Sequence, residues 1–374
     1  MTSVAFLIDQ LFYRVAGGIG TYVRELLPAL AAADPSLRLT LFHARFGDRA
    51  APAGWMEAAH RVPLGSGIRT LYPAWAVAGM PRLPAELATS RIVHTPSPAA
   101  VPPPRASQRL VVTVPDLAFV RYPRLFPPAW RALFRLGLRR AARRADALVA
   151  ISEHTGRDLV RLAGVDPSRV HVTPLAATLP QGGADAEPVL ERLGIAGPYV
   201  LFVGTLEPRK NVVRLVRAYR RAVARSGMPH ALVLAGPPGW GMEQLDRELA
   251  VPAAGRVTVT GRVADADLDA LYRGAAAFVY PSLYEGFGLP VLEAMARGVP
   301  TITSTASSLP EVAGDAALAV DPRSLEGLAA AIERLATDTG EAERLAAAGL
   351  ARAAAFSWER TARATLEVYE AVAR

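Results

Sequence analysis

The stretch Tyr199-Val-Leu-Phe-Val-Gly-Thr-Leu-Glu-Pro-Arg-Lys-Asn211 decides the fold. Five apolar residues followed by Gly204 predict a buried strand that ends in a loop, and we expect a helix to begin after Asn211. Lys210 is the only lysine among the 42 cationic residues, and it directly follows Arg209. Two adjacent cations in such a loop suit the oxygens of a phosphate or diphosphate, although a solvated helix start has the same pattern.

A second loop with ligand-binding character covers residues 281–296, again after an apolar strand. Gly286 and Gly288 allow the backbone to approach a ligand closely, and Pro290 suits the first turn of a helix. The positive end of that helix favours an anion. Glu285 in the loop and Glu293 in the helix can accept hydrogen bonds from sugar or ribose hydroxyls. An ordinary helix start with an acidic residue explains one of the two glutamates, but not the Gly-x-Gly-x-Pro run between them.

With these two loops the chain resembles the retaining glycosyltransferase family 4, nearest to its mannosyltransferase-like branch. The matching elements follow the family's order over nearly the whole chain: Gly17-Gly18-Ile19-Gly20, Gly204 to Asn211, Glu285 with Glu293, Leu309-Pro310-Glu311-Val312 and Phe356-Ser357-Trp358. One departure is Pro115-Asp116, because the family commonly has His-Asp there. That imidazole usually lies near the transferred sugar, so the resemblance does not extend to this contact, and Asp116 is kept as a candidate.

Apolar runs alternate with helical stretches, which predicts an α/β protein with parallel sheets covered by helices on both faces. Strands are expected at 4–8, 39–43, 92–94, 110–114, 147–151 and 170–174, and in a second set at 199–203, 231–235, 257–260, 276–280 and 301–303. The family resemblance implies the GT-B fold, in which two doubly wound Rossmann-like domains face each other across a cleft. The expected parts are an acceptor-binding domain at 1–180, a linker at 181–190, a nucleotide-sugar-binding domain at 191–355, and a helix at 356–374 that crosses back to the first domain.

The resemblance also implies the roles of individual residues. Arg209 and Lys210 are expected to neutralise the departing diphosphate, and Glu285 to hold hydroxyls of the transferred sugar; these three are the predicted catalytic residues. We expect Lys210 to be an exposed loop cation. Substrate and nucleotide contacts are expected from Gly17, Gly18, Asp116, Gly204, Arg262, Val263, Gly286, Phe287, Gly288, Leu289 and Glu293.

The predicted reaction moves a hexosyl group from a nucleotide-diphosphate sugar to a glycan, a lipid-linked acceptor or a small molecule, without a cofactor or metal. By resemblance the first choice of donor is GDP-mannose, and a UDP-sugar is the second. Asp265-Ala266-Asp267 matches an Asp-x-Asp metal triplet, but acids in the first turn of a helix also cap it and complement its dipole. Two alternatives stay open: a nucleotide-sugar epimerase on the same fold, and a non-catalytic protein that binds sugar nucleotides.

Composition excludes several other classes of protein. The 374 residues include no cysteine, so disulfides and thiolate metal sites are excluded, and the six histidines form no zinc-binding pair. No apolar run approaches the ~20 residues of a membrane span, and the start lacks the basic region of a signal peptide. No Walker loop or Gly-x-Gly-x-x-Gly run occurs. A cytoplasmic protein is expected, with peripheral association at the inner face of the membrane as an open alternative.

The positive charge is concentrated in the first half of the chain. Residues 1–180 contain 22 arginines and 11 acids, whereas residues 181–374 contain 20 cations and 23 acids. The stretch from Arg121 to Arg144 holds eight arginines and no acid, with aromatic and aliphatic residues between them. Such a stretch is typical of a helix on an anionic membrane surface, or of a helix whose arginines simply face water. Nucleic acid is not expected as a partner, because no nucleic-acid-binding motif accompanies the charge.

Overall fold

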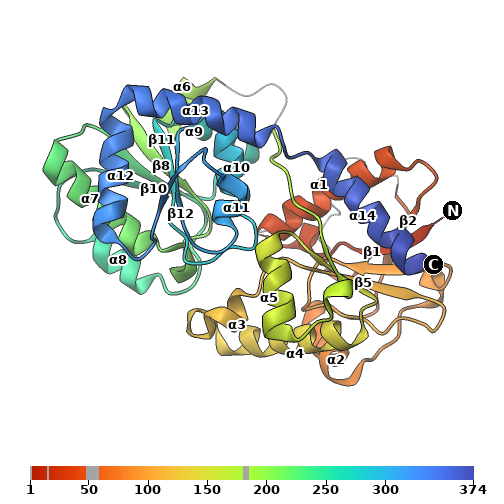
Figure 1. The fold of residues 1–374 in the computed structure, drawn as a ribbon. Helices are drawn as coiled ribbons and strands as arrows, with labels where there is room; N and C mark the ends of the chain where they lie inside the picture. Colours follow the sequence, from red (N-terminus) through yellow and green to blue (C-terminus); the bar gives the residue numbers. More distant parts are fainter. Residues whose placement is uncertain (1, 15–16, 48–58, 180–184) are drawn as a thin grey trace. The chain divides into compact units, whose positions relative to one another are not determined.

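The computed structural model describes residues 2–14, 17–47, 59–179 and 185–374. The chain divides into two compact units: unit 1 is Met1–Leu175 together with Ser357–Arg374, and unit 2 is Ala176–Phe356. Each unit contains one sheet of parallel strands with helices packed around it (Figure 1). The chain is therefore an α/β protein of two doubly wound units, as the sequence predicts.

Unit 1 is built on a seven-stranded parallel sheet in the order β3-β2-β1-β4-β5-β6-β7. The strands are β1 Ser3–Leu7, β2 Arg38–His43, β3 Arg61–Pro63, β4 Ile92–Thr95, β5 Arg109–Val114, β6 Ala147–Ala150 and β7 Val170–Val172. The helices are α1 Gly17–Ala33, α2 Ile68–Ala78, α3 Ala118–Arg121, α4 Pro128–Arg144, α5 Glu153–Ala163 and α14 Trp358–Ala373. The strand order reverses direction between β1 and β4, which makes this pair the topological switch point of unit 1.

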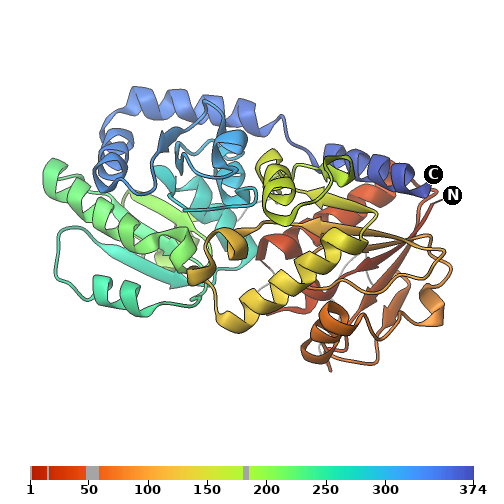
Figure 2. The same cartoon turned by 60° about the horizontal axis from the view of Figure 1, so that its bottom comes forward.

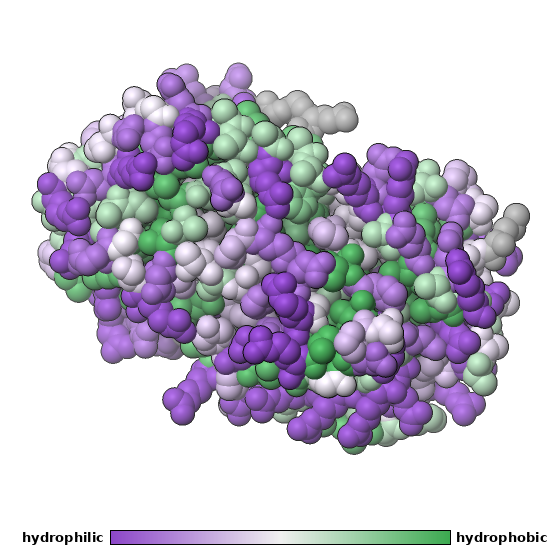
Figure 3. All heavy atoms as spheres, in the orientation of Figure 1, coloured by the Kyte–Doolittle hydropathy of each residue, from purple (hydrophilic) through white to green (hydrophobic). Residues whose placement is uncertain are grey.

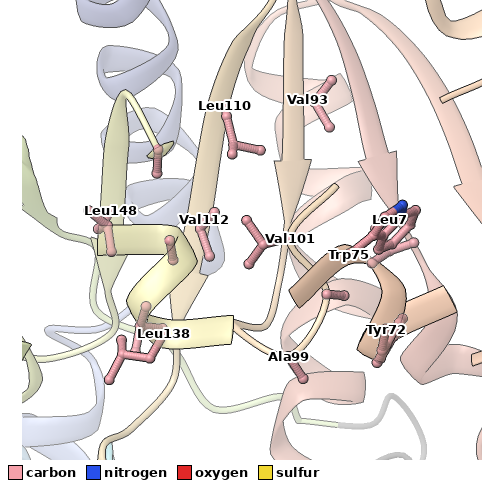
Figure 4. Close-up of a cluster of buried hydrophobic side chains, with 14 of the residues drawn as sticks. Leu7, Tyr72, Trp75, Val93, Ala99, Val101, Leu110, Val112, Leu138 and Leu148 are labelled. Carbon is pink, nitrogen blue, oxygen red and sulfur yellow. The ribbon is translucent and has the colours of Figure 1, made fainter. Parts of the chain in front are cut away.

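The core of unit 1 explains why these strands read as continuous apolar runs. Central strands of a parallel sheet are buried on both faces, so their side chains are apolar on both. Leu7, Val93 and Val112 point from three neighbouring strands into one cluster, and Trp75 and Leu138 cover it from α2 and α4 (Figure 4). Gly137 lets α4 pack closely on the loop after β4, because a Cβ at this position would lie 1.9 Å from the Pro98 carbonyl oxygen.

The last helix, α14, belongs to unit 1 although unit 2 precedes it in the chain. It packs against α1, β5 and β6, as expected of a helix that crosses back. A buried polar chain holds it there: the Tyr369 hydroxyl lies 2.6 Å from His94 Nδ1, and His94 Nε2 lies 2.7 Å from the Thr113 hydroxyl. Burial lowers the pKa of His94 to about 3, so the imidazole is neutral at physiological pH.

Unit 2 has a six-stranded parallel sheet in the order β10-β9-β8-β11-β12-β13. Its strands are β8 Tyr199–Val203, β9 Ala231–Ala235, β10 Val257–Gly261, β11 Ala277–Tyr280, β12 Thr301–Ser304 and β13 Leu318–Val320. Its helices are α6 Ala186–Arg192, α7 Val212–Ser226, α8 Glu243–Leu249, α9 Asp265–Arg273, α10 Leu289–Met295, α11 Leu309–Ala313, α12 Leu325–Thr337 and α13 Thr339–Ala353. The strand order reverses between β8 and β11, and this pair is the switch point of unit 2.

The structure contains all eleven predicted strands and corrects the sequence analysis in three places. The three-residue strands β3 and β13 were not predicted. The predicted linker 181–190 lies partly outside the described residues, and its second half is helical in α6, since Pro188 is tolerated in a first turn. Gly17 and Gly18, which the family resemblance places in a glycine loop, form the first turn of α1. Within the described residues, no helix is long and apolar enough to cross a membrane.

Candidate active site

The predicted catalytic residues come together at the switch point of unit 2. Arg209 and Lys210 lie in the short 3-10 helix Pro208–Lys210 after β8, and Glu285 lies in the loop after β11. They are about 75 positions apart in sequence, but β8 and β11 are neighbours in the sheet, with Phe278 in register with Leu201. Because the strands are parallel, both loops leave the same edge of the sheet, where open α/β sheets bind ligands.

Lys210 and Arg209 both pair with Glu285. Lys210 Nζ lies 2.7 Å from Glu285 Oε1, and Arg209 Nη1 lies 2.9 Å from Glu285 Oε2. Arg209 Nη2 also lies 2.6 Å from Glu207 Oε1, and Lys210 Nζ donates to the Tyr280 hydroxyl. Two cations and two carboxylates therefore form a compact cluster, which we call the Glu285 cluster.

The Glu285 cluster is buried, which corrects the expectation of an exposed loop lysine. Lys210 and Glu285 are only 8% and 7% exposed. Burial alone raises the pKa of Glu285, but the charges of Arg209 and Lys210 outweigh it and lower that pKa to about 2. Burial lowers the pKa of Lys210 from its usual value, while the facing carboxylate of Glu285 raises it. The next residue, Asn211, has a left-handed backbone (φ 63°) where α7 begins, and its side chain donates to the carbonyl oxygens of Pro281 and Pro322.

The geometry assigns Glu285 a direct contact that the sequence did not predict. Its two carboxylate oxygens are bound by the two predicted phosphate-binding cations, so it holds Arg209 and Lys210 in place. Tyr280, the last residue of β11, supports Lys210 from the other side. The sequence feature that could have identified Tyr280 is a tyrosine at the end of an apolar strand.

The loop after β11 is fixed by serines that follow β12. Ser308 donates to the carbonyl oxygens of Glu285 and Phe287 at 3.0 and 2.8 Å, and the Glu285 N–H donates to the Ser307 hydroxyl at 2.8 Å. Gly286, Phe287 and Leu289 are buried in this loop and at the start of the helix that follows it. Gly288 has φ 115° and a Cβ there would lie 2.6 Å from Leu309, which explains the glycine. The helix α10 then begins at Leu289 and spans seven residues.

Glu293 lies in α10, apart from the Glu285 cluster. Its Oε2 accepts a hydrogen bond from the Tyr272 hydroxyl at 2.9 Å. The Arg297 guanidinium stacks over the ring of Tyr272 at 5.1 Å and pairs with Asp269 at 2.7 Å. Glu293 is therefore oriented by a chain of polar contacts that reaches α9, which no sequence motif indicated.

Gly204 lies where the loops after β8 and β9 meet. Its carbonyl oxygen would be 2.0 Å from a Cβ on Gly236, so only glycine fits at position 236. Beyond this contact the two loops stay paired, because Leu206 N–H donates to Pro237 and Gly239 N–H donates to Leu206. Sequence analysis missed Gly236, although it follows an apolar strand as Gly204 does.

The remaining predicted residues of unit 2 follow β10, at the edge of the sheet. Arg262 is exposed and Val263 is half-buried. Both follow the carboxyl end of β10, so they lie at the same ends of the parallel strands as the loops that carry the Glu285 cluster. Asp267 pairs with Arg192 of α6 at 2.7 Å, and Asp265 lies exposed in the first turn of α9. In the part of the chain that the structure describes, no three acidic or histidine side chains are grouped to hold a metal ion.

In unit 1 the predicted residues follow two different strands, β1 and β5. Gly17 and Gly18 are exposed at the start of α1, which follows β1. Asp116 follows β5 and accepts a hydrogen bond from the Ala118 N–H at 2.9 Å, which forms an Asx turn just before the short helix α3. The structure thus gives Asp116 a local structural contact.

Sequence analysis missed the carboxylate at the switch point of unit 1. Asp9 follows β1 and is fully buried; it accepts hydrogen bonds from Tyr72 at 2.6 Å and from the Ala44 N–H at 2.7 Å. Burial raises its pKa to about 6, and the two hydrogen bonds oppose that shift. Burial also raises the pKa of Tyr13, which lies 3.4 Å from Tyr72, to about 12.

Comparison with known families places each half of the chain. Residues 16–178 match the family described as Glycosyltransferase Family 4, and residues 192–352 match Glycosyl transferases group 1. The chain is 33% identical over 395 residues to O-antigen chain mannosyltransferase B of Escherichia coli, an alignment that covers 98% of this chain and 99% of that protein.

Solved structures share the fold over the whole chain. The sucrose-phosphate synthase of Thermosynechococcus elongatus is 23% identical with a TM-score of 0.77, and the alignment covers 99% of both chains. HepE of Anabaena, crystallised in complex with UDP-glucose, is 19% identical with a TM-score of 0.71 and the same coverage. At these identities the likeness establishes the fold.

Proposed function

Because the chain belongs to glycosyltransferase family 4, whose members are retaining enzymes that use a nucleotide sugar, we propose that it transfers a mannosyl group from GDP-mannose. The choice of mannose is supported by the full-length similarity to an O-antigen mannosyltransferase. A UDP-sugar is the second choice, because a structural neighbour was solved with UDP-glucose. The acceptor in this proposal is a glycan, free or lipid-linked.

The Glu285 cluster is the observation that carries the proposal. Arg209 and Lys210 are held side by side, with charge-assisted hydrogen bonds to Glu285 that fix their positions before any ligand arrives. Of the three N–H bonds of Lys210, two are used by Glu285 and Tyr280, so a third remains for a phosphate oxygen. Preorganised cations of this kind stabilise charge that develops on a leaving group.

In the proposed step, the bond between the anomeric carbon and the diphosphate oxygen breaks while the acceptor oxygen bonds to the same face of the sugar. The acceptor's hydroxyl proton passes to the departing phosphate. Arg209 and Lys210 stabilise the negative charge that grows on the departing diphosphate. A metal ion has this role in other glycosyltransferases. Glu293, oriented by Tyr272, is proposed to accept hydrogen bonds from the ribose hydroxyls.

Gly17 and Gly18 are proposed to bring backbone close to the substrate. Arg262 and Val263 are proposed to lie beside the nucleotide base, and Gly204, Gly286, Phe287, Gly288 and Leu289 to offer backbone groups. Glu285 is proposed to contact the transferred sugar only after a donor phosphate has bound Arg209 and Lys210. The phosphate would weaken the ion pairs of these two cations with Glu285. This order of events follows from the pairing in the Glu285 cluster.

The experiment is a panel of nucleotide sugars incubated with the protein and a mannose-terminated glycan, with released nucleotide and glycan product both measured. We expect GDP-mannose to give product with retained configuration, and activity to persist in excess EDTA. Loss of activity in EDTA with rescue by Mn²⁺ would contradict the metal-free step. Conversion of the nucleotide sugar without transfer would favour an epimerase.

A further inference from the structure

The surface of unit 1 around α2 and α4 combines positive charge with exposed apolar side chains. Residues 61–144 contain 14 arginines and only two acids, Glu86 and Asp116. The large apolar residues that are most exposed here are Val77 (73%) and Met80 (54%) at the end of α2, and Trp130 (54%) and Leu136 (38%) on α4. Exposed apolar side chains and arginines therefore occur together on these two helices of unit 1.

The two helices present this chemistry side by side. Figures 1 and 2 both draw α2 next to α4, and the pair is in contact. The contact is located by Gly79, where a Cβ would lie 2.8 Å from the guanidinium of Arg140. Leu136, Arg140 and Arg144 are four residues apart and therefore share one face of α4. Val77 and Met80 lie within two residues of Gly79 and are therefore close to this contact.

The arginines of this face differ in what they do. Arg140 is half-buried and donates to the Val101 carbonyl oxygen at 2.9 Å, so it fastens α4 to the unit. Arg139, Arg143 and Arg144 are exposed, and none of the ion pairs found among the described residues involves them. The space-filling view shows hydrophilic side chains interspersed with hydrophobic ones over this part of unit 1 (Figure 3). We call Val77, Met80, Leu136, Arg139, Arg143 and Arg144 the α2–α4 face.

We propose that the α2–α4 face docks on an anionic lipid surface, with its arginines at the headgroups and its aliphatic side chains among the upper acyl carbons. Anionic headgroups complement a face of arginines without acids, and cations near such a surface bind it through its negative potential. Aliphatic side chains add binding energy at a lipid interface but nothing at a nucleic-acid phosphate. Scattered single apolar residues also lack the continuous apolar centre of a protein interface.

The proposal does not depend on the identity of the donor, and its test is separate from transfer activity. The probe is co-sedimentation of the protein with phosphatidylcholine vesicles, with and without phosphatidylglycerol, at low and at physiological salt. We expect binding only when phosphatidylglycerol is present. It should weaken as salt rises, because the screening length shortens to about 10 Å at 0.1 M.

Two variants separate the charge from the apolar side chains. Changing Arg139, Arg143 and Arg144 to Gln should lower the partition coefficient at low salt on the order of 100-fold, at about 1 kcal/mol for each cation. Arg140 is left unchanged because it holds α4 in place. The control removes the same charge from exposed arginines of unit 2: Arg225, Arg247 and Arg323 to Gln. A second variant, Val77→Ser with Leu136→Ser, should weaken binding even at high salt.

Each remaining outcome counts against the proposal. Wild-type protein that ignores phosphatidylglycerol at low salt overturns it, as does an equal loss of binding in the α2–α4 variant and in the unit 2 control. If the serine variant binds as wild type does and duplex DNA displaces the protein from vesicles, the face is a general polyanion surface. A change of oligomeric state in the triple variant would assign the face to a second copy of the chain.

Discussion

The switch points of the two units hold buried carboxylates in opposite electrostatic settings. In unit 1, Asp9 is surrounded by neutral donors, and burial raises its pKa to about 6. In unit 2, Glu285 is also buried, but two cations contact it and its pKa falls to about 2. The switch points of two sheets of the same kind therefore hold a carboxyl that resists ionisation in one unit and one that resists protonation in the other.

This difference shows how the same kind of sheet can hold a buried carboxyl group in either the charged or the neutral form. A carboxylate bound by two cations costs little to ionise and holds those cations ready for an anion. A carboxyl without a cation favours its neutral form and hydrogen-bonds neutral groups. The two cations suit the unit 2 switch point to an anion, whereas the carboxyl of Asp9 in unit 1 is fully buried and hydrogen-bonds Tyr72 and the Ala44 N–H.

The largest effect is expected from Lys210→Ala. Turnover should fall roughly 10²–10³-fold, the usual result of losing one group that stabilises transition-state charge. Unit 2 should also become less stable, because Glu285 keeps only Arg209 as a partner. Nucleotide release and thermal unfolding measure the two effects. Arg217→Ala is the control, since Arg217 forms an exposed ion pair in the same unit; activity of Lys210→Ala within a few-fold of wild type would remove Lys210 from the mechanism.

Glu285→Gln tests whether the carboxylate is structural as well as functional. Removing one partner of a buried ion pair leaves uncompensated charge, so unit 2 should lose about 3 kcal/mol of stability. The matched control is Glu326→Gln, because Glu326 pairs with Arg221 at an exposed site, where a pair contributes less than about 1 kcal/mol. Chemical denaturation followed by hydrogen exchange in β8 and β11 reports on unit 2. Equal stability of the two variants would show that the Glu285 cluster does not hold the site together.

Asp9→Asn should increase the stability of unit 1 at pH 8, whereas Glu285→Gln should decrease the stability of unit 2. The folded-state pKa of Asp9 is raised from 3.8 to about 6, so its contribution to stability is present below pH 3.8 and is lost as pH rises through 6. At pH 8 the ionised, buried carboxylate therefore costs about 3 kcal/mol, at 1.36 kcal/mol per pKa unit, and Asn avoids that cost.

The pH dependence sharpens the Asp9 prediction. Asp9→Asn should be more stable than wild type at pH 8, and the gain should shrink as pH falls to 4. His94 also makes stability depend on pH, because burial lowers its pKa from 6.5 to about 3, but this contribution is common to both proteins and cancels in the difference. Denaturation curves of unit 1 at several pH values check this, and a gain that does not vary with pH would contradict the raised pKa.

The smallest effect is expected from Asp116→Ala. The change removes the hydrogen bond that Asp116 accepts from the Ala118 N–H and should cost about 1 kcal/mol of stability in unit 1, while turnover stays within a few-fold of wild type. Asp116→Asn, which keeps an acceptor oxygen, should recover most of the stability. A large loss of turnover in both variants would return Asp116 to the substrate-binding residues.

The sequence predicts the architecture because alternating strand and helix patterns are local. Strands β3 and β13 escape prediction, since three residues at a sheet edge, one of them a proline in β3, show no period. The pairing of Glu285 with Lys210 depends on which strands are neighbours, a property of the whole sheet. The usual order of a doubly wound sheet places its first strand beside its fourth, and this rule could have predicted the contact. The burial of Asp9 had no local signal, because an aspartate after a strand usually faces water.

The helix α14 has a consequence for how the protein is made. It completes unit 1 through the contact of Tyr369 with His94, yet its residues leave the ribosome only after all of unit 2 has been synthesised. Unit 2 is contiguous in sequence and can fold as it emerges, whereas unit 1 must wait with an incomplete core. A nascent chain that ends before α14 would present a finished unit 2 beside an open unit 1, which is the form most exposed to chaperones and proteases.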